Sequence, residues 1–173
     1  MSKAESYRAL AALLEYPSRK ELLIESCGKV APWLGEDFPA MVHASTPAEL
    51  QEEYVAIFDF NPALAPYLGH HLYGDNQKKA SYMIAVKEQY RQFGFQPANR
   101  ELPDHLGVLL SFLAHLAVQG EDEFRRRFIH EMVAPGLEKF VAASVPRTRS
   151  PWLSLIEAAG LLCSADCQED STC

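Results

Sequence analysis

The chain has 173 residues, which suits a single domain because domains usually run to roughly 100–200 residues. Hydrophobic residues make up 48% of the sequence, enough for an ordinary core, and this excludes a chain that is disordered throughout. Acidic residues outnumber basic ones by 23 to 16, which gives a formal net charge of −7. That charge would repel a polyanion and argues against nucleic acid as a partner.

The N-terminal segment lacks the basic region, apolar run and cleavage site of a secretory signal. No stretch of the sequence approaches the roughly 18 apolar residues that a membrane-spanning helix needs. We therefore expect a cytoplasmic protein that does not insert into a membrane.

The first third of the chain predicts helices that are separated by prolines. Apolar residues recur at helical spacing up to Pro17, and segment 18–21 has capping-box spacing ahead of a second helix. Residues 28–47 hold three prolines and two glycines, which predicts a loop with a short helix over 39–43. Thr46 and Glu49 form a stronger capping box, with Pro47 at the first helical position.

Further helices follow in the middle and last parts of the chain. Asp75 is expected to cap a helix that Gly94 ends, and Pro103 to open the most apolar helix, which Gly120 ends. The next apolar pattern is bent or broken at Pro135, and segment 150–151 starts the last helix. No alternating β pattern is present. The sequence therefore predicts an all-α, single-domain helical bundle over residues 1–163, with a flexible tail over 164–173.

Metal and catalytic motifs are weak. Cys163 and Cys167 would share one helical face, but no histidine pair lies nearby in sequence, and adjacent His70 and His71 would point about 100° apart on a helix. The sequence contains no Gly-x-Ser-x-Gly elbow, glycine-rich phosphate loop or His-Glu-x-x-His motif. We therefore predict no metal site and no enzyme class.

Two clusters have both a structural and a functional interpretation. Pro103 should place Asp104 and His105 in the first helical turn, where the helix dipole favours a carboxylate, so this cluster with Glu101 is either a helix start or a binding turn. Aromatic residues four apart, at 54 and 58, are either core residues or the lining of an apolar groove for a peptide.

A resemblance to a known family rests on these same residues. The element from Asn99 to His105, Asn-Arg-Glu-Leu-Pro-Asp-His, precedes leucines at helical spacing and resembles the signature of the nitrate reductase delta-subunit chaperones of the NarJ type. The sequence is similar more broadly to the helical maturation chaperones of molybdenum oxidoreductases, which are related to TorD and DmsD proteins. Further stretches that fit the family are 13–17, 54–60 and 73–90.

The resemblance implies a system-specific cytoplasmic chaperone, not an enzyme, for the apo-catalytic subunit of a molybdenum reductase, with nitrate reductase as the expected client. Binding would often use the client's N-terminal twin-arginine or remnant signal segment. The client would carry bis-molybdopterin guanine dinucleotide, so we expect no permanently bound cofactor in a chaperone that is a monomer or a dimer. The partner-binding residues that the family pattern implies are Glu101, Pro103, Asp104 and His105 in the turn, with Tyr54 and Phe58 lining the groove.

Two alternatives come from other functional classes. One is a helical metal-dependent hydrolase that uses His70, His71, Asp104 and His105. The other is a permanent accessory subunit of an oxidoreductase. A tightly bound divalent ion would support the first, and co-purification with the mature, cofactor-loaded complex would support the second.

Overall fold

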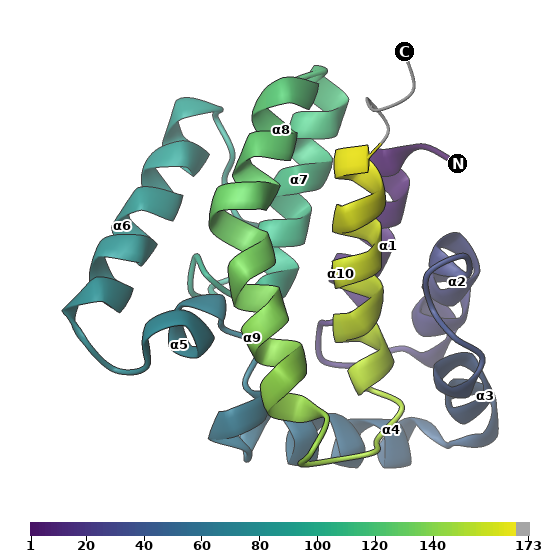
Figure 1. Ribbon diagram of the computed structural model, residues 1–173. Coiled ribbons are helices and arrows are strands. Elements are labelled where there is room, and N and C mark those ends of the chain that lie inside the picture. The colour runs from purple at the N-terminus through teal and green to yellow at the C-terminus, as the bar shows by residue number, and fades with distance from the viewer. Residues whose placement is uncertain (169–173) are drawn as a thin grey trace.

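The computed structural model describes residues 1–168 and confirms the all-α helical bundle (Figure 1). The described residues contain no strand, only an isolated antiparallel bridge between Tyr67 and His105. In chain order the elements are α1 (Lys3–Leu13), α2 (Lys20–Val30), α3 (Asp37–Ala44), α4 (Pro47–Tyr54), the π-helix η1 (Val55–Asp59), the 3₁₀ turn η2 (Pro62–Leu64), α5 (Leu68–Tyr73), α6 (Gln77–Gln92), α7 (Leu106–Gln119), α8 (Asp122–Phe128), the π-helix η3 (Ile129–Val133), α9 (Ala134–Ser144) and α10 (Leu153–Gln168).

The apolar helix α7 is the centre of the bundle. It packs against α1 along one side, and α10 packs against both α1 and α9. In Figure 1 these helices run side by side, with α6 at one edge, α2 and α3 at the other, and α4 crossing one end. Leucines and Phe112 of α7 are buried on nearly all sides, as the mostly apolar sequence of this helix predicts.

Two kinds of predicted helix boundary are confirmed: the capping box before α4, and the glycines that end α6 and α7. The hydroxyl of Thr46 accepts a hydrogen bond from the Glu49 amide at 3.3 Å, and the Glu49 carboxylate accepts one from the Thr46 amide at 2.8 Å, which confirms the capping box. Gly120 ends α7 in the left-handed conformation, with φ of 73°. Gly94, also at positive φ, follows the end of α6 as expected.

Several predicted helix boundaries are wrong. No side chain caps α2, and this helix continues through Gly28 to Val30 where a loop was expected. Asn76, not Asp75, caps α6, because Asp75 forms an ion pair with Lys79 at 3.0 Å instead. The last helix begins at Leu153, two residues after the predicted proline. Each error is a shift of a boundary and leaves the helix itself in place.

The predicted bend at Pro135 takes the form of a π-helix. Helix α8 passes into η3 and then into α9, so the three run on as one bent rod (Figure 1). Pro135 lies in the first turn of α9, directly after this π-helix, and because it has no N–H it cannot donate back to the preceding segment. A second π-helix, η1, directly follows α4 and ends at Asp59.

The expected boundary of the flexible tail is wrong for residues 164–168, which belong to α10. The reason is a buried ion-pair network around Asp166. Its carboxylate accepts hydrogen bonds from Arg125 at 2.7 and 2.9 Å and from the Tyr7 hydroxyl at 2.8 Å, and Lys3 lies 3.0 Å away. These contacts fix the end of α10 to α1 and α8. Residues 169–173 lie outside the described part of the chain.

We predict that Asp166→Asn lowers the free energy of unfolding by about 3 kcal/mol at pH 7, because it leaves the buried Arg125 without its main counter-ion. Burial alone would raise the pKa of Asp166, but its hydrogen bonds outweigh burial and lower it. The stabilisation is therefore complete above about pH 4 and declines as the pH falls through the lowered pKa. Urea unfolding at several pH values measures both effects.

The matched control is Asp122→Asn, which removes the other carboxylate that pairs with Arg125. The Asp122 side chain is 57% exposed, so we expect a loss of less than about 1 kcal/mol. Equal losses in the two variants would contradict the role assigned to the buried pair.

Candidate functional site

The loop over residues 94–105, between α6 and α7, carries the predicted binding turn. Its last part lies against the chain that leads into α5: the Leu68 amide donates to the Asp104 carbonyl at 3.0 Å, and the Leu106 amide donates to the Pro66 carbonyl at 2.8 Å. These bonds hold the turn at Pro103 and Asp104, and the extended residue His105, against the segment that leads into α5. Pro103 and Asp104 therefore precede the helix, which corrects the prediction that Pro103 opens it.

Asp104 caps a different helix from the one expected. Its side chain is fully buried, and Oδ2 accepts a hydrogen bond from the Gly69 amide at 3.0 Å in the first turn of α5. The other carboxylate oxygen, Oδ1, has no partner within the described residues. Burial raises the pKa of Asp104, against a weaker opposing effect of the Gly69 amide. The prediction that Asp104 contacts a partner directly does not fit this burial.

His105 is the N-cap of α7. Its Nδ1 accepts a hydrogen bond from the Gly107 amide at 3.1 Å, which requires a neutral ring with its proton on Nε2. Burial lowers the pKa of His105, and the carboxylates of Glu101 and Asp59 oppose that shift. The residue is only 4% exposed.

Tyr54 and Phe58 belong to the core, as the structural interpretation of their spacing predicted. They pack with Trp152, with ring centroids 5.4 and 6.0 Å from the indole, and the Tyr54 hydroxyl donates to the Leu14 carbonyl at 2.8 Å. Phe58 is 3% exposed and lines none of the three hollows described below, which favours the core interpretation; its role at an open groove stays a prediction. Tyr54 does reach the floor of a cleft.

That cleft has a volume of about 710 Å³ and is acidic. Three carboxylates lie on it, from Glu15, Asp59 and Glu101, against one guanidinium, from Arg100. The nearly buried Tyr54 and His105 lie at its floor. The remaining residues that line this acidic cleft are Leu14, Tyr16, Ser18, Ala98 and Asn99.

Glu101 is held at the cleft by an aromatic neighbour of His105. The Tyr67 hydroxyl donates to the Glu101 carboxylate at 2.8 Å, and the Tyr67 ring meets the imidazole edge-on at 5.3 Å. Burial, with this carboxylate close by, raises the pKa of Tyr67, so the hydroxyl remains a donor at neutral pH. The turn thus contributes to the site through Glu101 and His105.

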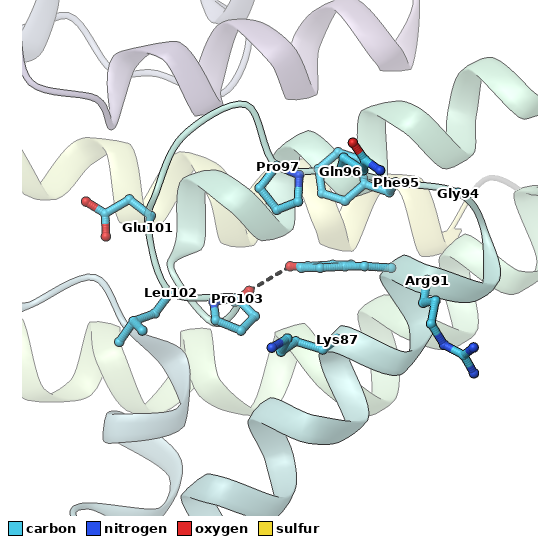
Figure 2. A pocket seen from close by; sticks show the side chains of 10 residues that line it. Lys87, Arg91, Gly94, Phe95, Gln96, Pro97, Glu101, Leu102 and Pro103 are labelled. Atoms are coloured by element: carbon cyan, nitrogen blue, oxygen red, sulfur yellow. Dashed lines mark hydrogen bonds between the residues drawn. The ribbon is translucent and has the colours of Figure 1, made fainter.

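The same loop forms one wall of a second, mostly apolar hollow of about 550 Å³ against α6. Tyr90 lines this hollow and donates through its hydroxyl to the Pro103 carbonyl at 2.6 Å. Figure 2 shows the Glu101 carboxylate pointing away from Pro103 and the hollow. Pro103 therefore supports the loop from the side opposite to the acidic cleft.

The residues of the hydrolase hypothesis do not converge. His71 donates from Nε2 to the Ala65 carbonyl at 2.8 Å and stacks on Phe140, whereas the His70 ring lies 3.8 Å from the Asp75 carboxylate. No group of three or more histidine, cysteine, aspartate or glutamate side chains within residues 1–168 is arranged to hold a metal ion. None of the helices in that range has the length and apolar character for crossing a membrane.

The sequence interpretation missed Glu15, Tyr16 and Asp59 as site residues. All three lie in stretches that resemble the family, 13–17 and 54–60, so a signal for them was present. Their proximity to Glu101 was not predictable, because it depends on the π-helix that ends at Asp59 and on the path of the 94–105 loop.

Comparison with known proteins assigns the chain to a family. The family model described as "Nitrate reductase delta subunit" matches residues 20–153. The chain belongs to this family. Membership confirms the resemblance, which runs from about Leu10 to about Leu116, and extends it to residue 153.

Relatives within the nitrate reductase delta subunit family carry chaperone names. The chain is 30% identical over 146 residues to the "Probable nitrate reductase molybdenum cofactor assembly chaperone NarJ" of Bacillus subtilis, covering 78% of this chain and 79% of that protein. It is 37% identical over 78 residues to the "Nitrate reductase molybdenum cofactor assembly chaperone NarJ" of Escherichia coli K12. That match covers 43% of this chain and 33% of the E. coli protein.

A solved structure shares the fold. The crystal structure of a protein from Archaeoglobus fulgidus, described as a redox enzyme maturation protein, superposes with a TM-score of 0.62 over 98% of this chain and 94% of that one. At 16% sequence identity the likeness supports the helical fold alone.

We predict that Asp104→Ala lowers the free energy of unfolding by about 1–3 kcal/mol, because the buried Gly69 amide loses its acceptor. Gly69→Ala should also destabilise, since a Cβ there would lie 2.7 Å from Asp104 Oδ2. The two effects should couple, because the alanine methyl group meets no carboxylate in the Asp104→Ala background. Denaturant unfolding of the double-mutant cycle measures this coupling, and additivity within about 0.5 kcal/mol would contradict the contact.

Proposed function

We propose that this protein is a cytoplasmic maturation chaperone that binds the catalytic subunit of a nitrate reductase before that subunit receives its molybdenum cofactor. The names of its relatives in Bacillus subtilis and Escherichia coli support the class of function. The acidic cleft carries the proposal for this chain, because it offers a bound polypeptide a firm floor and an anionic rim.

The charge of the cleft selects the kind of segment that it binds. Three carboxylates against one guanidinium leave the cleft negative, so it favours a segment with basic residues, such as an N-terminal twin-arginine or remnant signal segment. The floor is held by the hydroxyl of Tyr54 and the helix cap of His105, so it is formed before binding. Glu101, Asp59 and Glu15 then act as the groups that set the register of the bound segment.

Typical interaction energies indicate how charge and apolar contact share the binding free energy. An exposed ion pair contributes about 0.2–1 kcal/mol, whereas a micromolar complex requires about 8 kcal/mol of binding free energy. Burying roughly 400 Å² of apolar surface yields on the order of 10 kcal/mol before the ordering of the chains is subtracted. Apolar contact should therefore supply most of the affinity, and the carboxylates should supply orientation.

The cofactor belongs to the client in this proposal. Bis-molybdopterin guanine dinucleotide would enter the catalytic subunit while the chaperone is bound, and release would follow. The chaperone itself would bind no cofactor permanently and would act without a catalytic step. The hydrolase alternative is less favoured because His71, Asp104 and His105 each have a separate structural contact.

We predict that the triple variant Glu15→Gln, Asp59→Asn and Glu101→Gln captures at least tenfold less apo-catalytic subunit than the parent chain. The reason is the loss of three negative charges around one cleft, which a basic segment would otherwise contact. Pull-down from cells that lack the molybdenum cofactor measures capture, and molybdenum content of the reductase measures maturation. Raising the salt concentration should weaken the parent's binding more than the variant's.

The matched control is Glu36→Gln, Glu131→Gln and Glu157→Gln, which removes the same charge from exposed positions outside the cleft. This control should capture the subunit as the parent does. Equal capture by the two triple variants would contradict the cleft as the binding site. Recovery of the chaperone with only the mature, cofactor-loaded complex would instead support a permanent accessory subunit.

A further inference from the structure

Beside the acidic cleft, two aromatic side chains are exposed at the surface and are not packed into the core. Phe60 is 81% exposed and Tyr16 is 50% exposed, whereas Phe58, two residues before Phe60, is 3% exposed. The π-helix η1 ends between these two phenylalanines, so one ring enters the core and the other faces outward. Exposed aromatic side chains that lie close together mark an interaction site more often than isolated ones do.

Tyr16 and Phe60 are two walls of one hollow of about 400 Å³ on α4 and η1, which we name the aromatic shelf. Apolar atoms of Val55, Ala56 and Ala48 also line it. The shelf is fixed from behind, because the Gln51 side chain donates to the Pro17 carbonyl at 3.1 Å and so holds the turn after Tyr16 against α4. The aromatic shelf is therefore a formed surface that a partner can meet without rearrangement.

The shelf is continuous with the acidic cleft. Tyr16 lines both hollows, and Tyr54 on the cleft floor is followed directly by Val55 on the shelf. The Tyr16 ring lies edge-on to the Tyr54 ring at 5.8 Å, which makes it the partition between the two. Because Tyr16 lines both hollows, a bound chain can contact the carboxylates of the cleft and the apolar surface of the shelf together.

We infer that the aromatic shelf is a second subsite for the client segment, which binds with a basic residue in the acidic cleft and a large apolar side chain between Tyr16 and Phe60. This inference rests on the proposed function and adds the position and chemistry of the apolar contact. Charge complementarity supports the same occupant, because Glu52 lies on the shelf and Glu15 and Asp59 on the neighbouring cleft. An acidic segment would meet repulsion on both surfaces.

The test uses two fluorescein-labelled synthetic peptides of twelve residues, each with two arginines, followed by four leucines in one and four serines in the other. Fluorescence anisotropy gives the affinity of each peptide for the parent chain and for Phe60→Ser. The leucine peptide should bind the parent at least tenfold more tightly than the serine peptide. Phe60→Ser should weaken the leucine peptide about tenfold and the serine peptide less than twofold.

Three variants make the result specific. Phe60→Leu keeps an apolar side chain and should retain affinity within about threefold. Leu161→Ser removes an apolar side chain of 56% exposure from α10, which lines neither hollow, and should change nothing. Asp59→Asn should weaken both peptides by the same factor, because the arginines are common to both. A thermal melt of each variant checks that it remains folded.

The outcomes separate this inference from the function on which it rests. If Phe60→Ser weakens both peptides equally, or neither, the shelf is not an apolar subsite, even where the parent captures the apo-catalytic subunit normally. If neither peptide binds the parent at 1 mM, the paired subsites are also overturned. If the parent fails to capture the subunit at all while the leucine peptide still depends on Phe60, the proposed client is wrong and the subsite stands.

Discussion

The junction between residues 66–69 and 104–106 is the contact on which the candidate site depends. Two backbone hydrogen bonds join the segments, the Asp104 carboxylate caps α5, and His105 caps α7. Adjacent residues of one loop thus fix the starts of two helices. A buried carboxylate with one unpaired oxygen is unfavourable, so the other contacts of the junction must offset its cost. These contacts also position His105 at the floor of the cleft.

In this arrangement, part of the family signature supports the site and does not itself contact a partner. Asp104 lies within the core and Pro103 faces the hollow beside α6, so both act by placing their neighbours. Glu101 and His105 are the members of the turn that reach the acidic cleft. A turn of five residues therefore combines support and contact, and a substitution in it changes either stability or binding according to the residue.

A firm floor beneath exposed carboxylates suits the recognition of an unfolded segment. The floor residues are buried and hydrogen-bonded, whereas the rim residues Glu15, Asp59 and Glu101 are exposed. Weak ionic contacts of this kind orient a segment without making its release slow. That balance matches the proposed task of holding a subunit only until its cofactor is in place.

The sequence by itself determined the helices, because local capping and apolar spacing act within a few residues, as at Thr46–Glu49 and Gly120. It also determined the family, through the turn from Asn99 to His105. Only the tertiary structure decided which turn residues are accessible, because Asp104 finds its partner 35 residues away at Gly69. The two π-helices, the ion pair of Asp166 and the meeting of three separate carboxylates likewise depend on contacts between distant segments, which no local pattern records.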